Sequence, residues 1–249
     1  MPIAARWYGS CLLACFVLGA RSAPPVRLVI HEKASLAWWQ INPHLGDLWG
    51  TTCPAESSWH AGRDEDPFKR RTTGYAAVMD TIIPLYPRPV AQAVCAPGVS
   101  GEVSVSDTVT WRDVRGHFSV DVYTLTSGMP GRDTYARGNI LDAGRYPTID
   151  FQLDSVTGVA RKGDTLTGTA HGVFQMRGVP QAVALPVRAW REALGLRVTG
   201  KTGFPAMDLI NTYKMSKVSL GLGVASKVWK EVHWGIDAVL VPPGAEEGN

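Results

Sequence analysis

The chain has 249 residues, and its 25 lysines and arginines outnumber its 22 aspartates and glutamates by only three. This balance supplies no strongly basic patch, so the composition excludes the charge pattern typical of nucleic-acid-binding proteins. The length suits a single all-β domain with an insertion, because β-barrels often exceed about 200 residues as one domain.

The first 22 residues have the pattern of a secretory signal peptide. Arg6 precedes an apolar run over residues 11–20, and Ser22 follows it as a small residue. The run is shorter than the roughly 20 residues that a membrane-spanning helix needs. The sequence therefore predicts cleavage after Ser22 and an exported protein, periplasmic or secreted, with no membrane span. Cleavage lowers the formal charge from +3 to +1, because Arg6 and Arg21 are lost.

A lipoprotein signal is the alternative interpretation of this N-terminus. Residues 12–15 resemble a lipobox, which would leave a lipidated Cys15 at the mature N-terminus. The apolar run continues beyond Cys15, where a mature lipoprotein would become polar, so the sequence favours the cleaved signal peptide.

Two cysteines, Cys53 and Cys95, remain after the predicted cleavage. In an oxidising compartment such a pair most simply forms a disulfide. Closing a loop of about 43 residues would stabilise the fold by on the order of 4 kcal/mol on the chain-entropy model. Two free thiols are the alternative, and the spacing is not the C-x-x-C of a redox-active pair.

Alternation of apolar and polar residues predicts most of the fold. Residues 26–30 and 35–41 are expected to form the first two strands. Residues 118–124 and 149–154 alternate with a period of two, which is typical of strands with one face in an apolar interior. A short helix is predicted over residues 132–142, and Tyr146-Pro147 marks a turn at the entry to a strand.

Several segments that follow one another in a fixed order carry a family resemblance. They are Ser127-Gly128, Arg132-Asp133, Arg137, Leu141-Asp142, Tyr146 to Phe151, Gly163 to Gly168 and Met176 to Val187. Over roughly Gly101 to Val241 the chain resembles the YceI-like, polyisoprenoid-binding family. This resemblance implies an extended, lipocalin-like antiparallel barrel outside the cytoplasm, with a long apolar tunnel that holds an isoprenoid chain.

Residues 45–96 depart from the family pattern. We interpret them as an insertion that is closed by the Cys53–Cys95 pair. The predicted organisation is a signal peptide over 1–22 and a single barrel domain of about eight strands over 23–249, with the short helix at the barrel mouth. Eight strands form a barrel of the size that holds one small ligand.

The C-terminal third supplies further predicted strands at residues 194–200, 218–224 and 232–241. Taking one face of each predicted strand gives a set of apolar side chains that should line the tunnel. The set comprises Trp39, Phe118, Val120, Val122, Ile149, Phe151, Leu153, Leu220, Leu222, Trp234, Ile236 and Leu240.

Three polar residues, Arg132, Asp133 and Arg137, match the helix of the family. An ionic network there would orient the barrel mouth or a ligand head group. The alternative, which we favour, is structural: Asp133 caps the helix and pairs with an arginine, which contributes about 1 kcal/mol.

Patterns of known catalytic and metal sites are lacking in the sequence. The six histidines have no metal-ligand spacing, and the chain has neither a G-x-S-x-G motif nor a glycine-rich nucleotide loop. The sequence therefore predicts a protein that is not an enzyme and requires no cofactor or metal. The resemblance to the YceI-like family implies that the ligand is an isoprenoid quinone or a polyprenyl lipid, held by a carrier or sequestering protein.

An interaction protein is the second hypothesis. In that case the barrel is a scaffold, and the insertion closed by Cys53 and Cys95 docks on a membrane complex or on another copy of the chain.

Overall fold

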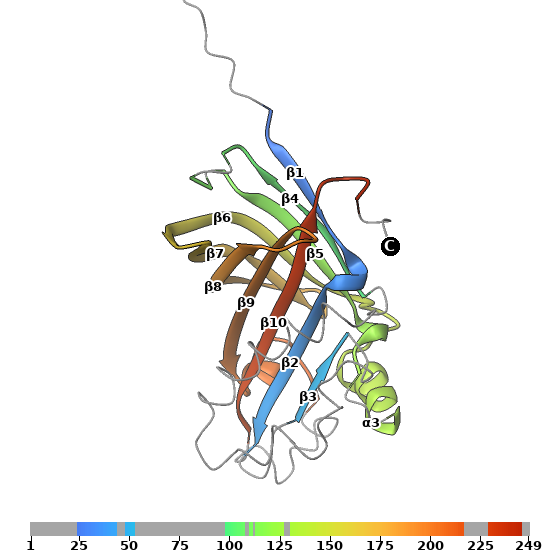
Figure 1. Cartoon of the computed structure of the whole chain (residues 1–249). Coiled ribbons are helices and arrows are strands. Elements are labelled where there is room, and N and C mark those ends of the chain that lie inside the picture. The colour runs from blue at the N-terminus through green and yellow to red at the C-terminus, as the bar shows by residue number, and fades with distance from the viewer. Residues whose placement is uncertain are drawn as a thin grey trace, which may run out of the picture.

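The computed structural model describes residues 24–43, 48–52, 98–107, 110–111, 113–126, 130–216 and 229–245. Within these ranges the chain forms a ten-stranded antiparallel sheet (Figure 1). The strands are β1 (Val26–Ile30), β2 (Leu36–Pro43), β3 (Leu48–Thr51), β4 (Val99–Val105), β5 (Arg115–Asp121), β6 (Thr148–Lys162), β7 (Thr165–Met176), β8 (Val179–Arg191), β9 (Leu196–Pro205) and β10 (Trp229–Val241).

Helical segments in the described ranges are short. They are the 3₁₀ turns η1 (Glu32–Ala34) and η3 (Val122–Thr124), the helix α3 (Pro130–Tyr135), the π-helical turn η4 (Ala136–Ile140) and the helix α4 (Asp208–Asn211).

Eight of the strands close into a barrel. The sheet order is β1-β4-β5-β6-β7-β8-β9-β10-β2-β3, and a further pairing of β1 with β10 joins the two sides. Closure leaves the barrel without the free sheet edges that would otherwise invite pairing with other chains. The all-β fold and the barrel of about eight strands predicted from the sequence are thus confirmed.

The long strand β10 determines where the barrel closes. One edge of β10 pairs with β9 from Glu231 to Leu240. On the other edge, β2 pairs with the first part of β10 and β1 pairs with Leu240 and Val241. The turn η1 lets one continuous segment make both pairings, so β1 closes the barrel while β2 and β3 extend the sheet beyond it (Figure 1).

The hydroxyl of Ser35 holds this change of direction in place. It donates to the carbonyl oxygen of His31 at 2.8 Å and accepts from the backbone N–H of Val239 at 2.9 Å. All three groups lie where the strand pairing is interrupted, and Ser35 is buried. The side chain therefore replaces the ladder hydrogen bond that a continuous strand would have made.

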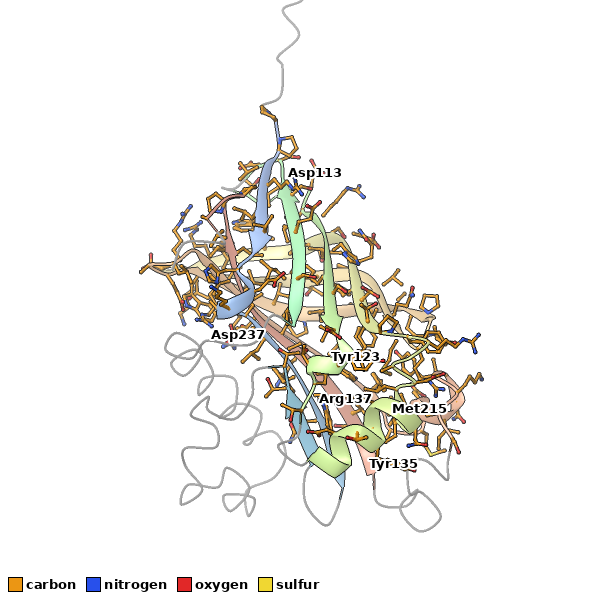
Figure 2. The ribbon with its side chains drawn as sticks, turned by 90° about the vertical axis from the view of Figure 1, so that its right-hand side faces the viewer. Asp113, Tyr123, Tyr135, Arg137, Met215 and Asp237 are labelled. Atoms are coloured by element: carbon orange, nitrogen blue, oxygen red, sulfur yellow. The ribbon has the colours of Figure 1, made fainter. Side chains whose placement is uncertain are left out.

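Two apolar clusters fill different levels of the barrel. The cluster we call the closed-end cluster gathers at the end near α3 and α4, where Figure 2 labels Arg137 and Met215. Its buried members are Val122, Leu125, Ala143, Ile149, Phe174, Met176, Ala206, Leu209, Tyr213, Met215, Val232 and Trp234. The second cluster lies further along β10, around Ala238 and Leu240.

The described segments agree with several predicted boundaries and revise others. The first strand covers the predicted residues 26–30, whereas the predicted strand 118–124 ends at Asp121. The strand β3 lies inside the predicted insertion 45–96, so that segment contributes one strand to the sheet. The signal segment 1–22, the Cys53–Cys95 pair and the predicted strand 218–224 lie outside the described residues.

Candidate ligand cavity

An apolar cavity lies inside the barrel. The space open to the centres of water molecules within it is about 150 Å³. A single buried water needs roughly 10–15 Å³ by the same measure, so this space is about ten times larger. Every barrel strand except β1 contributes to its wall.

Eight of the twelve residues predicted to line a tunnel border this cavity. They are Phe118, Val120, Ile149, Phe151, Leu153, Trp234, Ile236 and Leu240. Trp39 and Val122 instead pack in or against the closed-end cluster, and Leu220 and Leu222 lie outside the described residues.

A turn accounts for the position of Val122. The carboxylate of Asp121 accepts a hydrogen bond from the backbone N–H of Tyr123 at 2.8 Å, and the chain enters η3. Strand alternation therefore ends one residue before Val122, whose side chain is buried at the closed end. The sequence prediction for Val122 as a wall residue is corrected accordingly.

The sequence prediction missed the wall contributed by β7, β8 and β9. On these strands the cavity is bordered by Leu166, Ala170, Phe174, Leu185 and Val198, among others. In β7 the inward positions include glycines and alanine, so apolar alternation was weak there. The alternation of Leu166, Gly168, Ala170, Gly172 and Phe174 was nevertheless visible as a pattern of small and apolar residues.

Charged side chains point away from the cavity. Asp150 and Lys201 belong to strands of the cavity wall, but their side chains lie on the outer face of the barrel. The carboxylate of Asp150 accepts from the hydroxyl of Thr148 and lies 3.3 Å from His117 on the outer face. Burial lowers the pKa of His233, and the positive charge of Lys201 contributes to this lowering. His233 lies on the outer face of β10 beside Glu231. Among the described residues the interior is therefore an apolar surface with no ionised group.

A second, outer chamber opens at the end of the barrel that carries the start of β1 and the β4–β5 connection, near Asp113 in Figure 2. Its volume is about 690 Å³. It shares four lining residues with the inner cavity, namely Trp111, Leu166, Ala189 and Leu240. The two spaces therefore adjoin, and the outer chamber leads towards the inner one.

Aromatic packing closes the opposite end. Tyr213 contacts Phe174 with ring centroids 6.4 Å apart and Phe204 with centroids 5.3 Å apart. Burial, assisted by the negative charge of Asp208, raises the pKa of Tyr213 to about 12. The phenol is therefore neutral at physiological pH and acts as part of the apolar packing.

The short helix and its polar residues, which the sequence predicts at the barrel mouth, lie instead at this closed end. The carboxylate of Asp133 accepts from the hydroxyl of Thr126 at 2.6 Å. Arg137 donates to the carbonyl oxygen of Leu125 at 2.8 Å. Both bonds attach the helix to the segment after β5, and the helix lies away from the outer chamber (Figure 2). The side chain of Arg132 lies outside the described set.

A buried ion pair lies on the outer face of β9 and β10, which sequence reasoning missed. Arg197 donates to Asp237 at 2.7 Å and to Glu192 at 2.8 Å, and Arg197 and Asp237 are only 1% and 2% exposed. Burial raises the pKa of Asp237 to about 6 against the opposing attraction of Arg197. The ion pair holds the pKa of Arg197 above its ordinary value, although burial alone would lower it.

The described residues contain neither a metal-ligand cluster nor a membrane-spanning helix. No group of three or more histidine, cysteine, aspartate or glutamate side chains in them is arranged to hold a metal ion. No helix in the described part of the chain is long and apolar enough to cross a membrane.

Comparison with known proteins identifies the family. The model of the YceI-like domain matches residues 93–239, which is more than half of the chain. The chain belongs to the YceI-like family. The resemblance noted in the sequence is confirmed, and the match begins a few residues before the predicted limit at Gly101. No curated protein matches the chain.

Solved structures agree on the fold. Burkholderia cenocepacia BcnA is 13% identical, with a TM-score of 0.55 over 84% of this chain and 98% of that protein. A polyisoprenoid-binding domain from Saccharophagus degradans, implicated in plant cell wall breakdown, is 10% identical, with a TM-score of 0.51 over 88% of this chain and 99% of that one. At these identities the similarity establishes the shared barrel of the YceI-like family.

Proposed function

We propose that this YceI-like protein is an exported lipid-binding protein that holds a prenyl chain or similar amphiphile in its barrel, as a carrier or sequestering protein. The observation that carries the proposal is the inner cavity, whose wall is apolar and which adjoins an outer chamber. Burying a hydrocarbon chain there is favourable by roughly 25 cal/mol per Å² of apolar surface. The polyisoprenoid-binding description of the Saccharophagus degradans domain supports the choice of ligand class.

Export is supported by the signal-like pattern of the first 22 residues. Fractionation of cells that express the full chain, followed by intact-mass measurement, tests this part. A mature species in the periplasm or medium that lacks the first 22 residues is expected. A full-length species confined to the cytoplasm would contradict it.

Native mass spectrometry tests the binding. The protein purified from its own cells is expected to carry a prenyl quinone or polyprenyl lipid at near-unit stoichiometry, identified after extraction. A ligand-free mass that persists after incubation with these lipids would overturn the proposal.

A matched pair of variants tests whether the ligand occupies the cavity. Ala170 is 3% exposed and lines the inner cavity, whereas Ala184 is exposed on the outer face of the neighbouring strand. The two differ by one rung of the β7–β8 ladder, where Ala170 pairs with Leu185 and His171 pairs with Ala184. Ala170→Phe should abolish lipid binding, and Ala184→Phe should leave it unchanged.

Overpacking an interior costs about 1–3 kcal/mol, so folding of Ala170→Phe must be checked by circular dichroism and thermal unfolding. If Ala170→Phe does not fold, Gly200→Ala provides a milder change, because the added Cβ meets the tips of the Leu185 and Val187 side chains in the cavity wall. Full lipid binding by a folded Ala170→Phe would place the ligand elsewhere.

A further inference from the structure

Two arginines occupy strand positions whose side chains face the outer chamber. Arg161 pairs with Leu166 across β6 and β7, and Arg191 pairs with Leu196 across β8 and β9. Directly paired residues of an antiparallel sheet lie on the same face. Leu166 and Leu196 both line the chamber, so Arg161 and Arg191 face it as well, and both are among its lining residues.

Two irregularities in β6 cancel before Arg161. The β6–β7 register shifts between Leu153 and Ser155 and again between Thr157 and Ala160, and each shift adds a residue to β6. A β-bulge of this kind moves every later side chain of the strand to the opposite face, so the second bulge restores the first alternation. Arg161 therefore lies on the same face of β6 as Ile149, Phe151 and Leu153, which border the inner cavity.

The two guanidinium groups form no ion pair in the described part of the chain. Neither Arg161 nor Arg191 forms a hydrogen bond or an ion pair there, and both are exposed. Glu192, which also lines the chamber, accepts from Arg197 at 2.8 Å and from the indole N–H of Trp190 at 2.9 Å. Asp164 is the remaining carboxylate of the lining, so the two arginines exceed the uncommitted negative charge by one.

A third donor lies where the chambers adjoin. The indole nitrogen of Trp111 is buried and finds no hydrogen-bond partner among the described residues. Trp111 lines both spaces, and an indole can only donate. A buried donor without a partner is costly unless a bound acceptor satisfies it.

We infer that the outer chamber binds the anionic head group of the amphiphile, a phosphate or a carboxylate, through Arg161 and Arg191, while the chain occupies the inner cavity. This inference rests on the proposed function and specifies its ligand class. Arginine is suited to both groups, because its planar fork of donors matches carboxylate and phosphate oxygens. The apolar inner cavity lacks any ionised group that would accept such a head.

Matched lipids test the inference. Geranylgeranyl phosphate is compared with geranylgeraniol, and oleate with oleyl alcohol, by tryptophan fluorescence titration of the purified, delipidated protein. The wild-type protein is expected to bind at least one anionic lipid about tenfold more tightly than its alcohol, with a preference that falls as salt screens the charges. A preference for phosphate alone or for carboxylate alone identifies the head group.

A double variant and a charge-matched control complete the test. Arg161→Gln with Arg191→Gln should bring the ratio of affinities close to one while binding of the alcohol is retained. Lys162→Gln with Arg188→Gln removes the same charge from exposed neighbours that do not line the chamber, and should keep the preference. Equal affinity for acid and alcohol in the wild-type protein, or an unchanged ratio in the double variant, would overturn the inference and leave the proposed function intact. Failure of all four lipids to bind would instead contradict the proposed function.

Discussion

The buried pair of Arg197 and Asp237 predicts an asymmetric response to mutation. Arg197 makes two ion pairs, with Asp237 and with Glu192, whereas Asp237 Oδ1 accepts from Arg197 and Asp237 Oδ2 is buried with no partner in the described chain. Arg197→Met leaves Asp237 buried without its counter-charge, and breaking a buried pair in this way costs about 3–5 kcal/mol of unfolding free energy. Asp237→Asn removes the charge that is poorly solvated and leaves Arg197 paired with Glu192.

The pH dependence follows from the raised pKa of Asp237. The folded protein keeps this proton up to a pH of about 6, whereas the unfolded chain releases it near 3.8. Between these values the folded state binds more protons, so the unfolding free energy falls as pH rises. The difference of about two pKa units corresponds to at most about 3 kcal/mol, at 1.36 kcal/mol per unit.

Urea denaturation followed by tryptophan fluorescence at pH 4, 5, 6 and 7.5 measures both effects. Asp237→Asn should be as stable as the wild-type protein at pH 7.5, or more stable, and should lack the wild-type decline between pH 4 and 6 that this residue contributes. Arg197→Met should be destabilised at pH 7.5. A loss of several kcal/mol in Asp237→Asn at pH 7.5 would refute the reasoning, because it would mean that attraction to Arg197 outweighs the burial of the carboxylate.

Two further substitutions test the packing of the barrel wall and its closure. A Cβ added at Gly172 meets the carbonyl oxygen of Gln152 on β6, which cannot move without breaking the ladder, so Gly172→Ala should cost about 2 kcal/mol or more in urea denaturation. Gly138→Ala is its control, because a Cβ there meets nothing within 4 Å, and it should be neutral or stabilising by up to about 1 kcal/mol. Ser35→Ala removes the hydroxyl that accepts from the N–H of Val239 and donates to the carbonyl oxygen of His31. This change should lower the midpoint of thermal unfolding and reduce the unfolding free energy by about 2 kcal/mol. An unchanged midpoint would show that other groups take over these bonds.

Strand alternation was enough to predict the inward face wherever a strand was regular. Ile149, Phe151 and Leu153 on β6, and Trp234, Ile236 and Leu240 on β10, all border the cavity. This success has a simple cause, since a period of two assigns a whole strand to its faces once one residue is placed.

The alternation of apolar and polar residues did not predict where the strands are interrupted. The turn at Asp121 removes Val122 from the wall, and the two bulges of β6 change which residues face inward between Leu153 and Ala160. Both depend on contacts with other segments. A local hydrophobic pattern carries no information about such contacts.

Charge burial was missed for a related reason. Asp237 lies on the face of β10 that points away from the barrel interior, where polar residues are normally solvated. The structure shows it 2% exposed, against Arg197 on the neighbouring strand. Arg197 and Asp237 are 40 positions apart in the sequence and meet only because β9 and β10 pair. The ion pair could therefore be recognised only once the strand topology was known.

The two ends of the barrel differ in a way that would fix the direction of a bound amphiphile. The end near Tyr213 is filled by aromatic and aliphatic side chains, whereas the other end adjoins a chamber with Arg161 and Arg191 facing inward. A charged head moved into the apolar cavity would lose its hydration without compensation, at a cost far above that of any single apolar contact. On the proposed function the chain therefore enters first and its head stays in the outer chamber, so the lipid is released only when the head can exchange the arginines for water or for an acceptor outside the barrel.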